Sequence, residues 1–336
     1  MFFSNTALSI VIPMYNAKKH IRKVLDAILA QDYQGKIEVI VVNDGSSDRS
    51  LDIIYDFEKK GKIKILNQPN LGAVTATNNG FKVAQHDVIC SIDSDVVLHK
   101  NWLRKIMEEF CDPLVGAVQG YYKTPVNASF WARMMGYDVE ARYDAISSKY
   151  VTHVCTGNTA YRKAAINKVG LFDPAFQYGY DNDMSYRLQK AGYGLVFRKD
   201  ALCDHYWKPD FKSYVRQQYW SGYGRLQLIR KHGDRITGDS VSGIRMILQV
   251  PLLLLCIFSL SAGLIVPVQF RSFFLRTGLM FLVIMLFDRL LFSIRVIRKQ
   301  KDFTALFLPV VHLLRNFVWS WAFLQWSIRR FKKTKE

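Results

Sequence analysis

No CxxC pair occurs in the 336-residue sequence, and cysteine is scarce throughout it. The five cysteines are an odd number and lie far apart, at Cys90, Cys111, Cys155, Cys203 and Cys256. This pattern argues against a disulfide framework and against a thiolate zinc site, and it fits a reducing compartment.

Acidic residues are also in short supply, with 28 Asp and Glu against 46 Lys and Arg and a formal net charge of +18. Such an excess needs an anionic partner, which could be nucleic acid, lipid headgroups or a negatively charged substrate. The sequence contains no zinc-finger, RRM-type or other nucleic-acid signature, so we expect no nucleic-acid partner. Because basic residues lie beside hydrophobic segments, we predict anionic lipid as the partner.

The N-terminus has no basic region, and polar residues interrupt the apolar stretch of MFFSNTALSIVIP. It therefore differs from a secretory signal peptide and is typical of a first β-strand. We expect the part of the chain that carries the chemistry to remain in the cytosol.

Two periodicities alternate over the first 120 residues. Short apolar runs, typical of buried strands, occupy residues 8–12, 39–42, 63–66 and 88–92. Longer stretches with helical spacing lie between them, as at residues 21–29. Alternating strands and helices predict an α/β fold with a doubly wound, mostly parallel, Rossmann-like sheet.

Polar residues follow each of the four predicted strands, in residues 13–16, 43–48, 67–72 and 93–95. Ligands of such sheets bind beyond the carboxyl ends of the strands. The four segments are therefore expected to face one ligand crevice.

Asp93 and Asp95 follow the fourth predicted strand as a pair of carboxylates two residues apart. Such a pair can hold one hard divalent cation, Mg²⁺ or Mn²⁺, that also contacts diphosphate oxygens. A cation there would neutralise the charge of a diphosphate leaving group. The same pattern also occurs as an ordinary turn or helix cap, and the pattern alone leaves that alternative open.

Asp44 ends the second predicted strand, where its carboxylate could accept a hydrogen bond from a nucleotide base on which Tyr15 stacks. Asp48, in the same NDGSSD segment, is expected to be a helix cap. His205 follows a short predicted strand at residues 195–197. A lone His is usually structural, but near Asp-x-Asp an imidazole can complete the coordination of a metal.

Asp181 and Asp183 stand at the start of a predicted helix that runs to Lys190. The helix dipole favours carboxylates at this end. The pair could supply a general base for an acceptor hydroxyl, and helix capping is the alternative.

Three hydrophobic segments follow residue 245, at residues 246–268, 278–294 and 303–328. The first carries no charge and is long enough to span a bilayer, whereas the third contains His312 and Arg315. Three spans would place the basic tail outside, against the positive-inside tendency. We favour two spans with a re-entrant or interfacial third segment, which keeps the tail inside.

These patterns divide the chain into three parts. Residues 1–210 are expected to form a cytosolic catalytic domain, and residues 211–240 an aromatic and basic helix on the membrane interface. Residues 241–336 are expected to form a membrane domain of two or three hydrophobic helices with a basic tail.

Eight motifs occur in order over residues 8–206. They are SIVIPMYN, VVNDGSSD, NLGAVTATNNG, SIDSDV, CTGNTAYRK, GLFDPAF, GYDNDMSYRL and the terminal DH. In these motifs and their order the chain resembles family 2 glycosyltransferases, whose members have the GT-A fold.

The resemblance implies a role for individual residues. Nucleotide binding, usually of uridine, would fall to Pro13, Tyr15, Asn16, Asp44, Asn70 and Asp93. The metal ligands would be Asp93, Asp95 and His205, with Asp95 the main direct ligand. Asp181 would be the catalytic base with Asp183 alongside, and the donor or acceptor pocket would include Gly157, Asn158 and Trp220. The family usually has Glu where this chain has Tyr180, so the acceptor contacts are expected to differ.

We therefore predict an inverting glycosyltransferase at the cell membrane, with a catalytic domain that faces the cytosol. It would move one sugar from a nucleotide-sugar, preferably a UDP-sugar, to a polyprenyl-phosphate-linked saccharide or glycolipid. Single transfer is predicted because residues 217–220 lack the Arg of the Gln-x-x-Arg-Trp motif of processive members.

Two alternatives belong to other functional classes. A sugar nucleotidyltransferase would need a Gly-rich loop after the first strand, and PMYNAKKH has no glycine. A non-catalytic scaffold that binds nucleotide-sugars at the membrane would not need the carboxylates that this chain retains, Asp44, Asp93, Asp95 and Asp181.

Overall fold

The computed structural model describes residues 5–176 and 178–333, and the side chains of residues 329–333 lie outside the description. The predicted basic tail therefore has a described backbone only up to Lys333 and no described side chains. The chain divides into two compact units. The sheet unit comprises Met1–Asn127 and Tyr143–Trp207, and the helical unit comprises Ala128–Arg142 and Lys208–Glu336.

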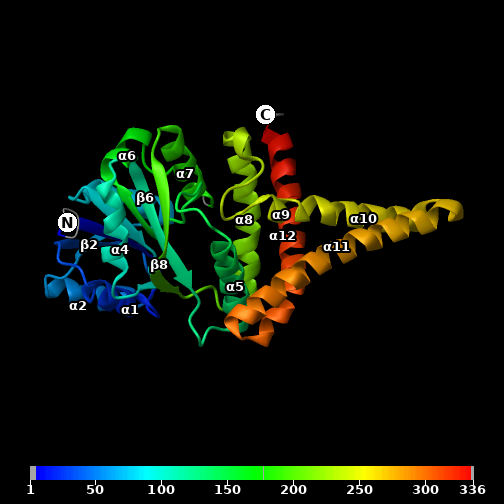
Figure 1. Ribbon diagram of the computed structural model, residues 1–336. Helices are drawn as coiled ribbons and strands as arrows, with labels where there is room; N and C mark the ends of the chain where they lie inside the picture. Colours follow the sequence, from blue (N-terminus) through cyan, green and yellow to red (C-terminus); the bar gives the residue numbers. More distant parts are fainter. Residues whose placement is uncertain (1–4, 177, 334–336) are drawn as a thin grey trace. The chain divides into compact units, whose positions relative to one another are not determined.

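One 8-stranded sheet forms the centre of the sheet unit (Figure 1). Its strands are β1 (Leu8–Met14), β2 (Ile37–Asp44), β3 (Lys64–Gln68), β4 (Val88–Ile92), β5 (Val96–Leu98), β6 (Val115–Lys123), β7 (Asn158–Arg162) and β8 (Gly194–His205). The strand order is β3-β2-β1-β4-β7-β6-β8-β5. The four strands predicted from apolar runs are present as β1 to β4. β3 is not the buried strand that was expected, because it lies at the edge of the sheet and none of its residues is buried.

The sheet is parallel on one side and mixed on the other. β1 pairs in parallel with β2 and β4, and β2 pairs in parallel with β3. β7 runs antiparallel to both β4 and β6, and β5 runs antiparallel to β8, whereas β6 and β8 are parallel. The predicted α/β fold is confirmed, with the antiparallel β7 inserted at the centre of the sheet.

The helices of the sheet unit connect and cover these strands. They are α1 (Ile21–Leu29), α2 (Ser50–Lys59), α3 (Ala73–Val83), α4 (Trp102–Met107), the 3₁₀ helix η1 (Glu108–Cys111), α6 (Lys163–Val169) and α7 (Tyr180–Lys190). In α1 the buried residues are Ile21, Val24, Leu25 and Ile28, the apolar stripe that predicted this helix.

The helical unit contains the hydrophobic part of the chain. Its elements are α5 (Phe130–Asp144, up to Arg142), α8 (Phe211–Lys231), η2 (Gly233–Arg235), α9 (Ile244–Ile247), α10 (Gln249–Ile265), α11 (Val268–Gln300), η3 (Phe303–Phe307) and α12 (Leu308–Lys333). Two described stretches are long and apolar enough to cross a membrane, Ile244–Ile265 and Phe303–Ile328. The predicted hydrophobic segment 278–294 lies within α11.

The helices α10 and α11 lie side by side (Figure 1). Glycine permits their close approach, because a Cβ atom at Gly278 would come within 2.7 Å of the Leu260 side chain. Leu253 and Cys256 of α10 form a buried cluster with Met285 of α11.

Two polar residues of α12, His312 and Arg315, are paired within the helical unit. His312 Nε2 lies 3.1 Å and Arg315 Nη1 lies 3.4 Å from the carboxylate of Asp138 in α5. Burial opposes ionisation of Asp138, but Arg142, His312 and Arg315 hold the pKa of its carboxyl well below the usual range. Polar groups inside an apolar helix are expensive unless they are paired in this way.

Candidate active site

The end of β4 brings Asp93 against the start of β7. The register pairs Ile92 with Asn158, and the Asp93 amide donates to the Gly157 carbonyl oxygen over 3.1 Å. A Cβ atom at position 157 would lie 2.0 Å from Asp93 Oδ2. Only glycine therefore leaves room for the Asp93 carboxylate at this point.

Asp95 and His205 face one another across the β5–β8 ladder. The antiparallel register places Val96 opposite His205, and Asp95 Oδ1 lies 3.4 Å from His205 Nε2. Adjacent ligands of one octahedral cation are about 3 Å apart, so these two donors could hold the same ion with little movement. The arrangement fits the predicted metal site.

The carboxylate of Asp44 is buried and organises the loop after β3. Oδ1 accepts from Gln68 Nε2 (2.7 Å) and from the Leu71 amide (2.8 Å), and Oδ2 accepts from the Gly72 amide (2.9 Å). A carboxylate has about four lone-pair sites, so these bonds leave room for one further donor. Tyr15 is half-exposed at the end of β1.

Asn16 joins the loops that follow β1 and β2. Its φ angle is 50°, and its Oδ1 accepts from the amides of Ser47 (2.8 Å) and Asp48 (3.2 Å). Asp48 in turn accepts from the Ser50 amide at the start of α2, over 2.9 Å. Both side chains therefore bind neighbouring backbone. The other predicted nucleotide contacts are Asn70, which is exposed, and Pro13, which is partly buried.

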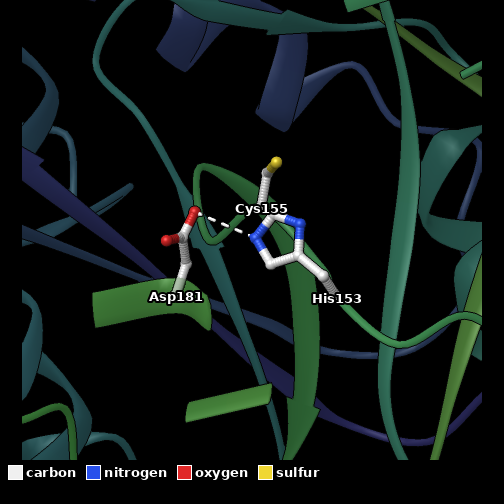
Figure 2. A group of neighbouring side chains, drawn as sticks. All are labelled: His153, Cys155 and Asp181. Carbon is white, nitrogen blue, oxygen red and sulfur yellow. Dashed lines mark ion pairs between the residues drawn. The ribbon is translucent and has the colours of Figure 1, made fainter. Parts of the chain in front are cut away.

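Asp181 lies in the first turn of α7 beside two residues of the loop before β7 (Figure 2). Its Oδ2 lies 3.5 Å from Nε2 of the buried His153, and Cys155 completes a group whose ligand atoms lie within 4.8 Å of one another. Sequence reasoning did not assign His153 or Cys155 to the site. The only local signal is their His-x-Cys spacing ahead of the Thr-Gly-Asn segment.

Asp183 points into the protein instead of toward this group. It is fully buried, and its Oδ2 accepts from Arg187 Nε over 2.8 Å. The Arg187 guanidinium also donates to the carbonyl oxygens of Val169, Gly170 and Leu171. Asp183 thus orients Arg187, and Arg187 connects α7 to the end of α6.

Tyr180, where the resembling family usually has Glu, precedes Asp181. Burial, reinforced by the charges of Asp93 and Asp181, raises the pKa of its phenol well above the usual value. The side chain is therefore neutral at physiological pH and adds no second carboxylate beside Asp181.

The remaining predicted pocket residues lie in different units. Asn158 is fully buried, and its Oδ1 accepts from Trp102 Nε1 over 2.7 Å. Its Nδ2 has no protein partner among the described residues. Trp220 belongs to α8 of the helical unit, where its ring packs against Tyr219 and Tyr223.

Comparison with known proteins gives a family match and a fold match. The model of glycosyl transferase family 2 matches residues 9–170. The chain is 26% identical over 260 residues to the pre-mycofactocin glycosyltransferase of Mycobacterium tuberculosis, covering 71% of this chain and 51% of that protein. It is 27% identical over 203 residues to the poly-beta-1,6-N-acetyl-D-glucosamine synthase of Staphylococcus epidermidis, covering 58% and 49%.

The chain thus spans about half the length of these two curated relatives. Among solved structures, it is similar to the mannosyltransferase PcManGT of Pyrobaculum calidifontis in complex with GDP-Man and Mn²⁺. The TM-score is 0.58 at 15% identity, with 93% of this chain and 87% of that chain covered. This likeness shows the GT-A fold.

Proposed function

Because the chain belongs to glycosyl transferase family 2, we propose that it is an inverting glycosyltransferase that moves one sugar from a nucleotide-sugar to a membrane-associated acceptor. The observation that carries the proposal is a set of three carboxylates in the sheet unit, two after the end of a strand and one at the start of a helix. Asp93 and Asp95 follow β4, and Asp181 begins α7. Asp93 and Asp95 are suited to binding a diphosphate and its cation, and Asp181 is suited to act as the general base.

The chemical step assigned to this chain is a single displacement. The Asp181 carboxylate takes the proton of the acceptor hydroxyl, whose oxygen attacks the anomeric carbon. The new C–O bond forms as the bond from carbon to diphosphate oxygen breaks, and the nucleoside diphosphate leaves with the electron pair. His153, whose Nε2 lies 3.5 Å from Asp181 Oδ2, would orient the carboxylate toward the acceptor.

A divalent cation, Mg²⁺ or Mn²⁺, would be held by Asp95 and His205, with Asp93 toward the nucleotide. When bound, it would supply positive charge to the diphosphate leaving group. The fit of Asp95 and His205 supports this assignment. The presence of Mn²⁺ in the mannosyltransferase of the same fold is consistent with it.

A screen of purified protein identifies donor and acceptor together. Radiolabelled UDP- and GDP-sugars are incubated with Mn²⁺ or Mg²⁺ and a lipid extract, and label in the organic phase is counted. Label from one donor, dependent on the lipid, is the expected result. Release of pyrophosphate from a sugar phosphate and a nucleoside triphosphate would instead support the nucleotidyltransferase alternative.

Binding of the nucleotide is expected to depend on Asp44 and Tyr15, with uridine preferred. Calorimetry with UDP, GDP and CDP should give tightest binding for UDP. Asp44→Asn should weaken it about 10-fold or more, the worth of a hydrogen bond to a charged group. Tyr15→Ala should weaken UDP binding without disturbing the loop that Asp44 holds. Tyr55 is another exposed tyrosine, and Tyr55→Ala is the control that should bind UDP like the wild type. Equal binding of all three nucleotides, unchanged in Asp44→Asn, would contradict base reading by Asp44.

Gly157→Ala is expected to lower transfer activity about 10²-fold, because an added methyl displaces the Asp93 carboxylate and misplacement of about 1 Å can cost that much. Gly233→Ala is the matched control, since nothing lies within 4 Å of a Cβ there. Steady-state rates and melting temperatures separate a local effect from unfolding. If Gly157→Ala transfers sugar at the wild-type rate, the assignment of Asp93 to the donor site is wrong.

The helical unit is proposed as the membrane anchor, with catalytic unit and tail in the cytosol and anionic lipid bound by basic residues. With two spans, a cysteine introduced at Lys333 lies in the cytosol. An impermeant thiol reagent applied to intact cells should therefore not label Lys333→Cys.

Labelling of Lys299→Cys by the same reagent distinguishes which helices span the membrane. Labelling at 299 from outside is expected if Ile244–Ile265 and Phe303–Ile328 cross, and protection is expected if α11 returns to the cytosol. Labelling at 333 from outside would favour three spans.

A further inference from the structure

Three side chains of types that bind transition metals meet in a group that includes the proposed base. His153, Cys155 and Asp181 have ligand atoms that all lie within 4.8 Å of one another (Figure 2). We propose that this His–Cys–Asp cluster binds one Zn²⁺ ion. We further propose that the ion regulates transfer by occupying the Asp181 carboxylate. The regulatory half rests on the proposed function, whereas the binding half does not.

The donor types select zinc over the cation proposed for the donor site. Imidazole nitrogen, thiolate sulfur and carboxylate oxygen are all zinc ligands, and three protein ligands leave a fourth position open. Mg²⁺ and Mn²⁺ prefer oxygen and are poorly matched to a thiolate. The cluster and the Asp95–His205 pair therefore differ in chemistry.

The observed spacing is close to that of a tetrahedral site. Donors at ordinary zinc distances lie roughly 3.3–3.8 Å from one another. Asp181 Oδ2 and His153 Nε2 are already 3.5 Å apart. The thiol, within 4.8 Å of both, needs to move by only about 1 Å, which a small side-chain rotation provides.

Charge balance favours the same ion. Zn²⁺ carries two positive charges, which the Cys155 thiolate and the Asp181 carboxylate neutralise while His153 binds as a neutral imidazole. A neutral complex suits a site in which His153 is 6% exposed and the Asp181 side chain 23% exposed, because an unbalanced charge would be costly there.

Hydrogen bonds from neighbouring groups hold two of the three ligands in place. Tyr143 Oη donates to Cys155 Sγ over 3.2 Å, and the Asn182 amide donates to Asp181 Oδ1 over 2.9 Å. Oδ2 is thereby the oxygen that faces His153. Outer partners of this kind orient metal ligands and raise affinity.

Ser185 connects the two chain segments that supply the ligands. Its hydroxyl accepts from the Val154 amide over 3.1 Å and donates to the Asp181 carbonyl oxygen over 2.7 Å. Val154 lies between His153 and Cys155. The loop and the first turn of α7 are therefore linked by hydrogen bonds without any metal.

Cobalt spectroscopy on the metal-free full-length protein tests binding directly. Titration with Co²⁺ should produce a thiolate-to-cobalt absorption band that saturates at one ion per chain and disappears when Zn²⁺ is added. The band should be absent in Cys155→Ala and Cys155→Ser. It should persist in Cys111→Ala, an exposed cysteine outside the cluster, and in Asp95→Ala. Zinc affinity should fall more than about 10²-fold in Cys155→Ala, because loss of an outer partner alone costs 10–100-fold.

No band in the folded wild type, or an unchanged band in both Cys155 variants, would overturn the proposed site. The regulatory half is tested by adding Zn²⁺ to the enzyme with saturating Mn²⁺, each variant being compared with its own zinc-free rate. Inhibition of the wild type and resistance of Cys155→Ala are expected. A band without inhibition would overturn the regulatory role, whereas full turnover of Asp181→Asn would refute the proposed base independently of zinc.

Discussion

Asp181→Asn is expected to lower turnover about 10²–10⁴-fold, the usual worth of a positioned general base. Amide nitrogen cannot accept the proton of the acceptor hydroxyl, while the shape of the side chain is retained. Affinity for the nucleoside diphosphate should stay within a few-fold, because the base contacts the acceptor. Single-turnover kinetics and nucleotide titration measure the two quantities separately.

Asp183→Asn is the matched control for this experiment, two residues along the same helix. Its carboxylate is buried against Arg187, so the variant should lose stability, by about 2 kcal/mol for a charge-assisted hydrogen bond. Its turnover should exceed that of Asp181→Asn under conditions where both are folded. Near-normal turnover in Asp181→Asn with loss of turnover in folded Asp183→Asn would reverse the assignment.

Asp95→Ala is expected to lower activity at least about 10³-fold and to weaken Mn²⁺ binding, since a metal ion contributes several kcal/mol of charge stabilisation. The remaining imidazole of His205 is a weaker ligand for a hard cation than the carboxylate that was removed. Calorimetric Mn²⁺ titration and steady-state rates check the two expectations, and excess EDTA should inactivate the wild type.

Asp204 offers a matched control on the strand that carries His205. Successive side chains of a strand point to opposite faces, and Asp204 Oδ1 pairs with His99 Nε2 over 3.2 Å. Asp204→Asn should therefore leave Mn²⁺ binding unchanged, whereas His205→Gln should weaken it. Full turnover in excess EDTA would refute the metal requirement.

The first half of the sheet and its helices could be predicted from local pattern. Apolar runs at residues 8–12, 39–42, 63–66 and 88–92 became β1 to β4. The runs of β1, β2 and β4 are almost continuously buried, because a parallel sheet that is covered on both faces buries successive side chains. The same reasoning placed Asp44 and Asp93 at carboxyl strand ends, since parallel strands share one edge. The family motifs added the expected roles.

Pairings between distant segments could not be predicted in this way. The insertion of β7 beside β4 places Gly157 against Asp93, and the β5–β8 ladder places His205 opposite Val96. Antiparallel and parallel pairing use the same kinds of residue, so an apolar run does not reveal its neighbours. The contact between Gly157 and Asp93 is visible only in the folded chain.

The different positions of Asp181 and Asp183 were decided by packing. Two residues apart on a helix are about 200° apart around its axis, so one carboxylate faces the site and the other the interior. Their sequence pattern is identical for either choice. Arg187 donates a hydrogen bond to Asp183, which is thereby held in the interior near the end of α6. Asp181 instead lies beside His153 and Cys155, which come from a segment outside α7. Local periodicity thus established the strands, the helix and the carboxylates, whereas contacts between segments far apart in the chain determined which carboxylate faces the proposed chemistry.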